Sequence, residues 1–271
     1  MILLAPVGPK YRDVQRAQGQ RIEAVQRRGK FLILPLSGGD EAIVHLGMTG
    51  VVTTEWPGDR QAAHERVRLE LSGAPPSCLH FVDPRRFGRF LVVSAGRYDG
   101  LPTLAALGPE PLDDGFTDEV FLAALRRSRM AIKTYLLSQR PVAGVGNIYA
   151  DEALWRARVH PETPAAALSP RRARELRSAI RAVLAASIQA QGTTLNDYRT
   201  VNGEVGAYLD QLDAYGHAED PCPRCGTSLR RSVVGQRGTV HCPRCQPRPR
   251  GTAGRVGRTS GRARRPSRGV A

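Results

Sequence analysis

The stretch "CPRCGTSLRRSVVGQRGTVHCPRC" (residues 222–245) determines the C-terminal part of the fold. Two Cys-Pro-Arg-Cys pairs enclose 16 residues, and this is the spacing of a zinc ribbon. Four thiolates fill a tetrahedral shell and leave no open position, so the metal is expected to be structural. We therefore predict one Zn²⁺ bound by Cys222, Cys225, Cys242 and Cys245.

The residues between the two cysteine pairs predict a β-hairpin whose turn is "GQRG" (residues 235–238). Zinc supplies folding free energy that so small a unit cannot obtain by burying apolar surface. Gln236 and Arg237 are expected at the tip of this hairpin. Two interpretations remain open from the finger alone: Arg237 contacts a partner, or the finger only packs and Arg237 is solvated.

The composition points to a polyanionic partner. The 271 residues contain 40 Lys plus Arg against 25 Asp plus Glu, a net charge of +15. The tail 247–271 holds eight Arg and no acid, so it accounts for only part of this excess. A strongly basic chain attracts nucleic acid over a Debye length. Apolar runs such as "FLILPL" (residues 31–36) are too short to span a bilayer.

The chain divides into four segments, and together they predict an α+β multi-domain fold. Short apolar strands between turn signals predict a β-sandwich over 1–100. Helix caps at Thr117 and Ser169, and an apolar stripe that includes Ile188, predict a helical domain over 101–215. The zinc finger follows over 216–246. The Arg-, Gly-, Ser- and Pro-rich segment 247–271 is expected to be disordered.

Three further motifs could bind DNA. "GVGNIYADEALW" (residues 144–155) places glycines and an asparagine at the start of a helix, where backbone amides can bind phosphate. "DPRRFG" (residues 83–88) combines arginines with an aromatic side chain that could wedge into a base stack. "HLGMTG" (residues 45–50) places a methionine between glycines. Each motif taken singly is also compatible with an ordinary turn or with core packing.

Together and in this order, these segments resemble the formamidopyrimidine-DNA glycosylase / endonuclease VIII family, and specifically its formamidopyrimidine branch. The resemblance extends from about residue 11 to residue 246. It implies a β-sandwich, a helix–two-turn–helix domain and a zinc-finger hairpin, with duplex DNA between them. The matching pieces are "RRGKFLIL", "IVHLGMTG", "DPRRFG", "LGPEPL", "AIK", "PVAGVGNIYADEALW", "HP", "GTTL", "YG" and the finger.

The resemblance also implies roles for individual residues. Lys30 would be catalytic near the scissile sugar, and Arg237 would take part in the second elimination. The space left by an extruded base would be filled by Met48, Arg85 and Phe87. Phosphates around the extruded nucleotide would be contacted by His64, Arg86, Arg129, Lys133, Asn147 and Arg237.

The implied activity is that of a bifunctional DNA glycosylase and AP lyase. It would flip out oxidised purines such as 8-oxoguanine and formamidopyrimidines, excise them from duplex DNA and cleave the strand by elimination. Damaged duplex DNA would be the partner and one structural zinc ion the only cofactor. We further expect a monomer without a small-molecule cofactor or a membrane partner, in the cytoplasm and associated with the nucleoid.

The N-terminus departs from the family, whose members begin Pro-Glu-Leu-Pro-Glu and use the proline amine as nucleophile. This sequence begins "MILLAPVGPK" (residues 1–10). The nitrogen of Pro6 is a tertiary amide inside the chain and is not a useful nucleophile. We expect that the native start lies further upstream. The alternative is a lesion-binding module without catalysis, and a more distant one is a zinc-ribbon protein that binds RNA.

Overall fold

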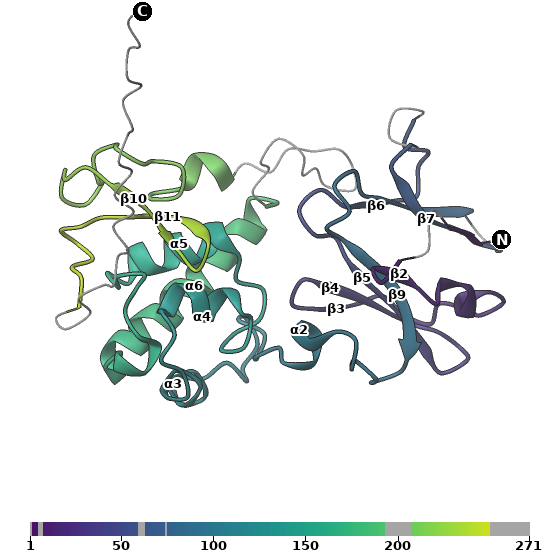
Figure 1. Cartoon of the computed structure of the whole chain (residues 1–271), viewed down its shortest axis with the longest axis horizontal. Coiled ribbons are helices and arrows are strands. Elements are labelled where there is room, and N and C mark those ends of the chain that lie inside the picture. Colours follow the sequence, from purple (N-terminus) through teal and green to yellow (C-terminus); the bar gives the residue numbers. More distant parts are fainter. Residues whose placement is uncertain (1, 5–7, 59–62, 74, 193–207, 250–271) are drawn as a thin grey trace, which may run out of the picture.

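A computed structural model describes residues 2–4, 8–58, 63–73, 75–192 and 208–249 of the chain. Figure 1 shows strands gathered in one body and helices in a second, with a two-stranded hairpin on the helical body. The structure therefore confirms the predicted order of a β-rich part, a helical part and a C-terminal hairpin. In the described residues, no helix combines the length and apolarity needed to cross a membrane.

The β-rich body consists of two sheets. The four-stranded sheet has the order β1-β7-β8-β6 and the five-stranded sheet has the order β2-β9-β5-β4-β3. Neighbouring strands are antiparallel except for the parallel pair β2 and β9. The strands are β1 (Ile2–Leu4), β2 (Tyr11–Arg12), β3 (Gln26–Arg28), β4 (Phe31–Pro35), β5 (Asp40–His45), β6 (Val51–Thr53), β7 (Glu65–Glu70), β8 (Cys78–Val82) and β9 (Arg89–Ser94).

The five-stranded sheet is buried on both faces. One face packs through Leu34, Val44 and Phe90 against Phe81 and Val67 of the other sheet. The opposite face carries a second apolar cluster that includes the helix α2 (Pro102–Ala105). Successive strand residues point to opposite faces, so burial on both sides explains why β4 reads as an unbroken apolar run.

The helical body contains four further helices around one core. The Thr117 side chain accepts a hydrogen bond from the Val120 amide, and Ser169 accepts one from the Arg172 amide, so both predicted N-caps are confirmed. The predicted stripe is wrong at Ile188, which is exposed near the end of the last helix. The helices are α3 (Asp118–Arg126), α4 (Ile132–Leu137), α5 (Asn147–Arg156) and α6 (Pro170–Gln189).

Three short 3₁₀ helices complete the described part of the chain: Val14–Ala17, Ala165–Ala167 and Tyr208–Gln211. The segment after the last of these is anchored to α5 by the buried carboxylate of Glu152. This carboxylate accepts hydrogen bonds from the backbone amides of Asp213, Ala214 and Tyr215 at 2.8–3.0 Å. The segment that leads into the zinc finger is therefore held against α5 before the chain reaches Cys222.

The C-terminal hairpin pairs β10 (Arg230–Val234) with β11 (Arg237–His241). Gly235 and Gln236 have φ angles of 56° and 63°, as a tight two-residue turn of this kind requires. The tip is therefore Gly235–Gln236. The prediction that Arg237 shares the tip is wrong by one residue, because Arg237 is already paired with Val234 as the first residue of β11.

Candidate nucleic-acid interface and metal centre

The four predicted cysteines form one metal site. Their sulfur atoms all lie within 4.8 Å of one another, close enough to share a tetrahedral ion. Trp155 donates its indole N–H to the Cys222 sulfur at 3.4 Å, and the Cys245 amide donates to the Cys242 sulfur at 3.3 Å. This closed set of thiolates confirms the prediction of one structural Zn²⁺ and is not suited to binding a substrate.

The hairpin is attached to the helical body by a buried ion pair. Lys133 on α4 and Asp151 on α5 approach to 2.6 Å, and their side chains are 0% and 1% exposed. The Lys133 ammonium also donates to the Gly238 carbonyl and the Thr239 hydroxyl, each at 2.8 Å. The second Asp151 oxygen accepts from the Val240 amide at 3.1 Å. These contacts hold β11 directly beyond Arg237.

The burial of Lys133 does not fit its predicted role as a direct phosphate contact. The sequence motif "AIK" places a lysine in the first turn of α4 but does not indicate what covers it. Burial raises the pKa of Asp151 to about 6, which still leaves this carboxyl ionised at pH 7. Lys133 is therefore a cation that is neutralised inside the protein. It can contribute to DNA binding only indirectly, by holding the hairpin in position.

Asn147 connects the hairpin to the N-terminus of α5. Its side-chain amide donates to the Gly238 carbonyl at 3.1 Å, next to Arg237. Gly146 is the N-cap residue and does not cap the helix with a side chain. The first amides of the helix can therefore bind an anionic ligand. Asn147 therefore lies beside the residue that follows Arg237, and the role of both as phosphate contacts stays a prediction.

Sequence reasoning missed the residue that shapes the loop before α5. Gln139 is buried and has a φ of 64°. Its side chain accepts from the Gly144 amide at 2.8 Å and donates to the Val145 carbonyl at 2.5 Å. It therefore fixes the glycine loop, although nothing in its local sequence distinguishes it from a solvent-exposed glutamine.

Lys30 reaches this loop from the β-rich body. It lies in the two-residue turn between β3 and β4, directly before the first residue of β4. Its ammonium group donates to the Val145 carbonyl at 3.3 Å. A Cβ atom on Gly146 would lie 3.2 Å from that ammonium nitrogen. The residue at 146 therefore has to be small if Lys30 is to keep this position.

The electrostatic environment of Lys30 lowers its basicity. The side chain as a whole is exposed, whereas its amine end lies against the helical body. Burial of this end, and secondly the charge of Arg237, lower the pKa of Lys30 to about 8. A cavity of about 340 Å³ adjoins it, lined among others by Phe31, His45 and Met48. The positive charges of Lys30, in the β-rich body, and Arg237, in the hairpin on the helical body, therefore repel each other.

Glu110 braces the turn that carries Lys30. Its carboxylate accepts from Arg27 at 2.7 Å, from Arg28 at 2.8 Å and from the Gly29 amide at 2.6 Å. Burial would raise the pKa of Glu110, but these hydrogen bonds outweigh burial and lower it. The motif "LGPEPL" contains this residue, yet its partners lie more than 80 positions away in the sequence.

The three predicted wedge residues lie on two neighbouring loops. Met48 and Phe87 are 59% and 46% exposed, and the Arg85 guanidinium lies 4.7 Å from the centre of the Phe87 ring. The loops approach so closely that a Cβ atom on Gly47 would lie 2.7 Å from the Gly88 nitrogen. Apolar side chains that stay exposed on closely packed loops are suited to insertion between bases.

Asp83 joins the two wedge loops. This fully buried residue accepts from the Thr49 hydroxyl at 3.0 Å, from the Gly88 amide at 2.6 Å and from the Tyr11 hydroxyl at 3.2 Å. These donors reach both oxygens of the Asp83 carboxylate. Arg86 is exposed and has a φ of 54°.

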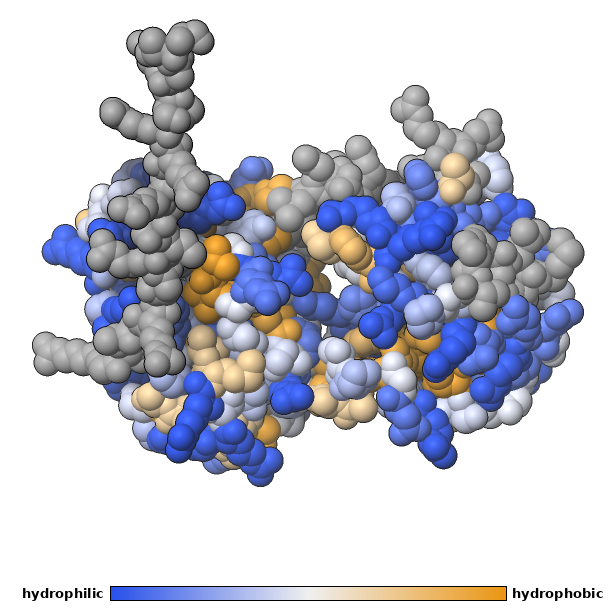
Figure 2. All heavy atoms as spheres, viewed as in Figure 1, coloured by the Kyte–Doolittle hydropathy of each residue, from blue (hydrophilic) through white to orange (hydrophobic). Residues whose placement is uncertain are grey.

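The remaining predicted DNA contacts are solvent-exposed. His64 and Arg129 both lie on the surface of the described chain. His64 belongs to the β-rich body and Arg129 to the segment that precedes α4. In Figure 2 a gap separates the two bodies, and hydrophilic residues occupy much of its rim. This gap lies in the region of the molecule where DNA was predicted to bind.

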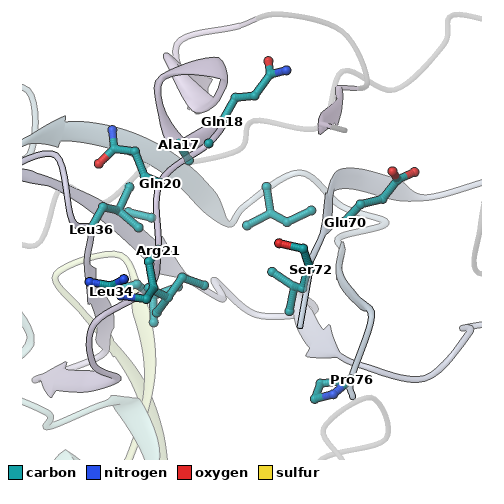
Figure 3. Close-up of a pocket in the computed structure, with 14 residues that line it drawn as sticks. Ala17, Gln18, Gln20, Arg21, Leu34, Leu36, Glu70, Ser72 and Pro76 are labelled. Carbon is teal, nitrogen blue, oxygen red and sulfur yellow. The ribbon is translucent and has the colours of Figure 1, made fainter. Parts of the chain in front are cut away.

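A larger cavity lies away from these residues. It has a volume of about 490 Å³ and opens between the two sheets. Figure 3 shows Leu34 and Leu36 on one side of it and Glu70, Ser72 and Pro76 on the other. The described residues that line this cavity include none of the predicted site residues and bring no set of catalytic groups together. The candidate site is therefore the region around Lys30 and Arg237.

Family models match each part of the chain. Residues 6–90 match the formamidopyrimidine-DNA glycosylase N-terminal domain, and residues 107–199 match the formamidopyrimidine-DNA glycosylase H2TH domain. Residues 219–248 match a zinc finger found in FPG and IleRS. The three matches follow the order of the β-rich body, the helical body and the hairpin.

Curated relatives and solved structures agree with these matches. Formamidopyrimidine-DNA glycosylase of Deinococcus radiodurans is 45% identical over 251 residues, covering 88% of this chain and 86% of the relative. The crystal structure of the MutM (Fpg) protein from Thermus thermophilus superimposes with a TM-score of 0.81 at 45% identity, covering 90% of each chain. The structure of Lactococcus lactis Fpg with DNA containing an abasic site superimposes with a TM-score of 0.72 at 33% identity, covering 85% of this chain and 83% of that chain.

A two-body fold with a zinc-finger hairpin and a basic site between the bodies defines a class of DNA-repair glycosylases. Within this class, the chain belongs to the formamidopyrimidine-DNA glycosylase family. The family, the fold class and the zinc finger predicted from the sequence are therefore confirmed.

Proposed function

We propose that this protein is a DNA glycosylase and AP lyase that excises oxidised purines from duplex DNA. The observation that carries the proposal is the convergence of groups from both bodies at one place. Lys30 from the β-rich body lies against the glycine loop of α5, and Arg237 and Asn147 lie beside the same loop. Cationic groups and helix amides so arranged can neutralise the phosphates around one extruded nucleotide.

The wedge loops supply the second requirement of base extrusion. Removing a base from the stack leaves a gap, and filling that gap offsets the cost of unstacking. Met48 and Phe87 offer exposed apolar side chains for this purpose, and Arg85 offers hydrogen-bond donors for the base left behind. His64, Arg86 and Arg129 are proposed as phosphate contacts, since all three are exposed. Lys133 is proposed to act only by positioning β11.

The names of the relatives support the proposed substrate. They are called formamidopyrimidine-DNA glycosylases, and solved relatives hold DNA with an abasic site or a damaged purine. One chain contributes both sides of the site, which supports action as a monomer in contact with damaged duplex DNA. Zinc is proposed as the sole cofactor, and association with the nucleoid would follow from DNA binding. The match of the β-rich body and the helical body to domains of formamidopyrimidine-DNA glycosylase favours DNA over the RNA-binding alternative.

The test is the release of 8-oxoguanine from a duplex that carries one such base opposite cytosine. We expect free 8-oxoguanine and a cleaved strand, with an undamaged duplex of the same sequence as control. Lesion-selective binding without base release would identify the lesion-binding module instead. Equal binding of damaged and undamaged duplexes, again without release, would contradict the proposal.

A further inference from the structure

Lys10 contacts the loop 83–88, which carries the proposed wedge residues Arg85 and Phe87. The Lys10 ammonium donates to the Arg86 carbonyl at 2.6 Å, although the two residues are 76 positions apart in the chain. The same ammonium lies 5.7 Å from the centre of the Phe87 ring, within the distance at which a cation is attracted to an aromatic face. Lys10 therefore contacts both the backbone and the aromatic side chain of this loop.

Backbone and core contacts place Lys10 beside the loop. The Lys10 carbonyl accepts a hydrogen bond at 2.9 Å from the amide of Phe90, which follows the loop in the chain. The next residue, Tyr11, is buried, and its hydroxyl donates at 3.2 Å to Asp83 at the start of the loop. The segment that carries Lys10 is therefore attached to both ends of the loop by contacts that do not involve the ammonium group.

The conformation of Arg86 explains what the ammonium contact stabilises. Arg86 has a φ of 54°, a left-handed conformation that is unfavourable for a residue other than glycine and persists where neighbouring contacts hold it. The Arg86 amide donates to the Asp83 carbonyl at 3.3 Å, a longer hydrogen bond than the one that Lys10 makes. The Arg86 carbonyl belongs to the planar peptide group that joins Arg86 to Phe87. A donor that fixes this carbonyl therefore also fixes the direction in which the chain enters Phe87.

The Phe87 side chain has little other support from the protein. It is 46% exposed, and the Arg85 guanidinium lies 4.7 Å from the centre of its ring. Contacts with two cations restrict the directions that this exposed side chain can take. A side chain that is already ordered loses less conformational entropy when it inserts into a partner.

We propose that Lys10 is a positioning residue for the wedge: it holds the loop 83–88 in the conformation that presents Phe87 and Arg85 to a gap in the DNA stack. This inference rests on the proposed function, because the wedge acts only when a nucleotide is extruded. The alternative is that Lys10 is one more phosphate contact, since its ammonium has three N–H groups and the Arg86 carbonyl takes one of them.

The first experiment measures hydrogen exchange in the full, zinc-loaded chain without DNA. Lys10→Met keeps the length of the side chain and removes the ammonium group. We expect faster exchange of the Gly88 amide, which donates to Asp83 within the loop at 2.6 Å, whereas exchange in β4 and β5 stays slow. Lys10→Arg retains a cationic donor and should restore slow exchange. Arg12→Met is the matched control, because it removes a nearby cation that pairs with Asp13.

The second experiment measures dissociation constants of the same variants at several salt concentrations. The probes are a duplex with one abasic-site analogue opposite cytosine and the undamaged duplex of the same sequence. We expect Lys10→Met to weaken binding of the lesion duplex by roughly fivefold, the scale of one exposed charged contact. Its affinity for the undamaged duplex and the salt dependence of binding should stay near wild type.

Three results would overturn the proposal. Equal losses for the two duplexes, with the salt slope reduced by about 0.9, would identify Lys10 as a phosphate contact instead. Unchanged exchange at Gly88 in Lys10→Met would show that the ammonium does not hold the loop. Faster exchange with unchanged selectivity for the lesion duplex would show that the held conformation does not serve DNA binding. A wild-type protein without lesion selectivity would contradict the proposed function, whereas exchange at Gly88 would still decide whether Lys10 holds the loop.

Discussion

Asp151→Ala is the substitution that most directly tests how the finger is held. The change removes the anion that pairs with Lys133 inside the protein and the acceptor of the Val240 amide. Lys133 would then be a buried cation whose remaining partners are the Gly238 carbonyl and the Thr239 hydroxyl. We expect β11 to detach from α4 and α5, and Arg237 to lose its fixed position.

The magnitude follows from the burial of the pair, whose side chains are at most 1% exposed. Removing one member of a buried ion pair typically costs about 3–5 kcal/mol. An unsatisfied buried amide at Val240 adds about 1–3 kcal/mol. These costs together are comparable with the stability of a small domain, so the hairpin should open locally before the β-rich body unfolds.

Hydrogen exchange of the Val240 amide is the assay, combined with the affinity for lesion DNA. We expect exchange at this amide to accelerate strongly and the affinity to fall, whereas exchange in β4 and β5 stays slow. Arg97→Ala is the control, because Arg97 and Asp99 form an exposed ion pair, which contributes at most about 1 kcal/mol. Unchanged exchange at Val240 in Asp151→Ala would refute the reasoning.

Three further predictions concern the two bodies and the metal. Arg237→Ala should weaken binding of lesion DNA while zinc content stays intact. The control Arg174→Ala, at an exposed position of α6, should bind lesion DNA nearly as wild type. Fluorescence anisotropy would measure both affinities, and an equal loss of affinity in the two variants would contradict a specific role of Arg237. Glu110→Gln should lower the free energy of unfolding by about 1–3 kcal/mol, measured by urea unfolding. Because the pKa of Glu110 is lowered in the folded state, the stability difference between wild type and variant should be complete above pH 4.5. It should disappear as the pH falls through the lowered pKa of Glu110. Removing zinc with a chelator should abolish lesion binding and leave circular dichroism of the strands largely unchanged, and re-added zinc should restore binding; binding that survives chelation would show that the finger is dispensable.

The features that the sequence predicts well are local. The two cysteine pairs, the caps at Thr117 and Ser169 and the apolar strand β4 all depend on residues close to one another in the chain. Their physical causes are the geometry of zinc coordination, the unsatisfied amides of a helix N-terminus and the burial of both sheet faces. None of these causes requires knowledge of distant contacts.

The buried acids could not be predicted, because their roles depend on distant contacts. Asp83, Glu110 and Asp151 bind partners up to 72, 83 and 89 positions away. In the sequence they look like ordinary charged residues of loops and helices. The burial of Lys133 has the same origin, since the hairpin that covers it begins almost a hundred residues later. The resemblance to the family also predicts a loop near residues 200–209 that contributes to substrate choice. This loop falls mostly outside the described residues, and its role stays a prediction.

The central claim is that the site between the two bodies recognises damaged DNA, and a comparison of affinities tests it most directly. The measurement is the dissociation constant for a duplex with one abasic-site analogue opposite cytosine, compared with the undamaged duplex at the same salt concentration. We predict tighter binding of the lesion duplex by roughly tenfold or more, and loss of most of this difference in Arg237→Ala. Equal dissociation constants for the two duplexes would contradict the account.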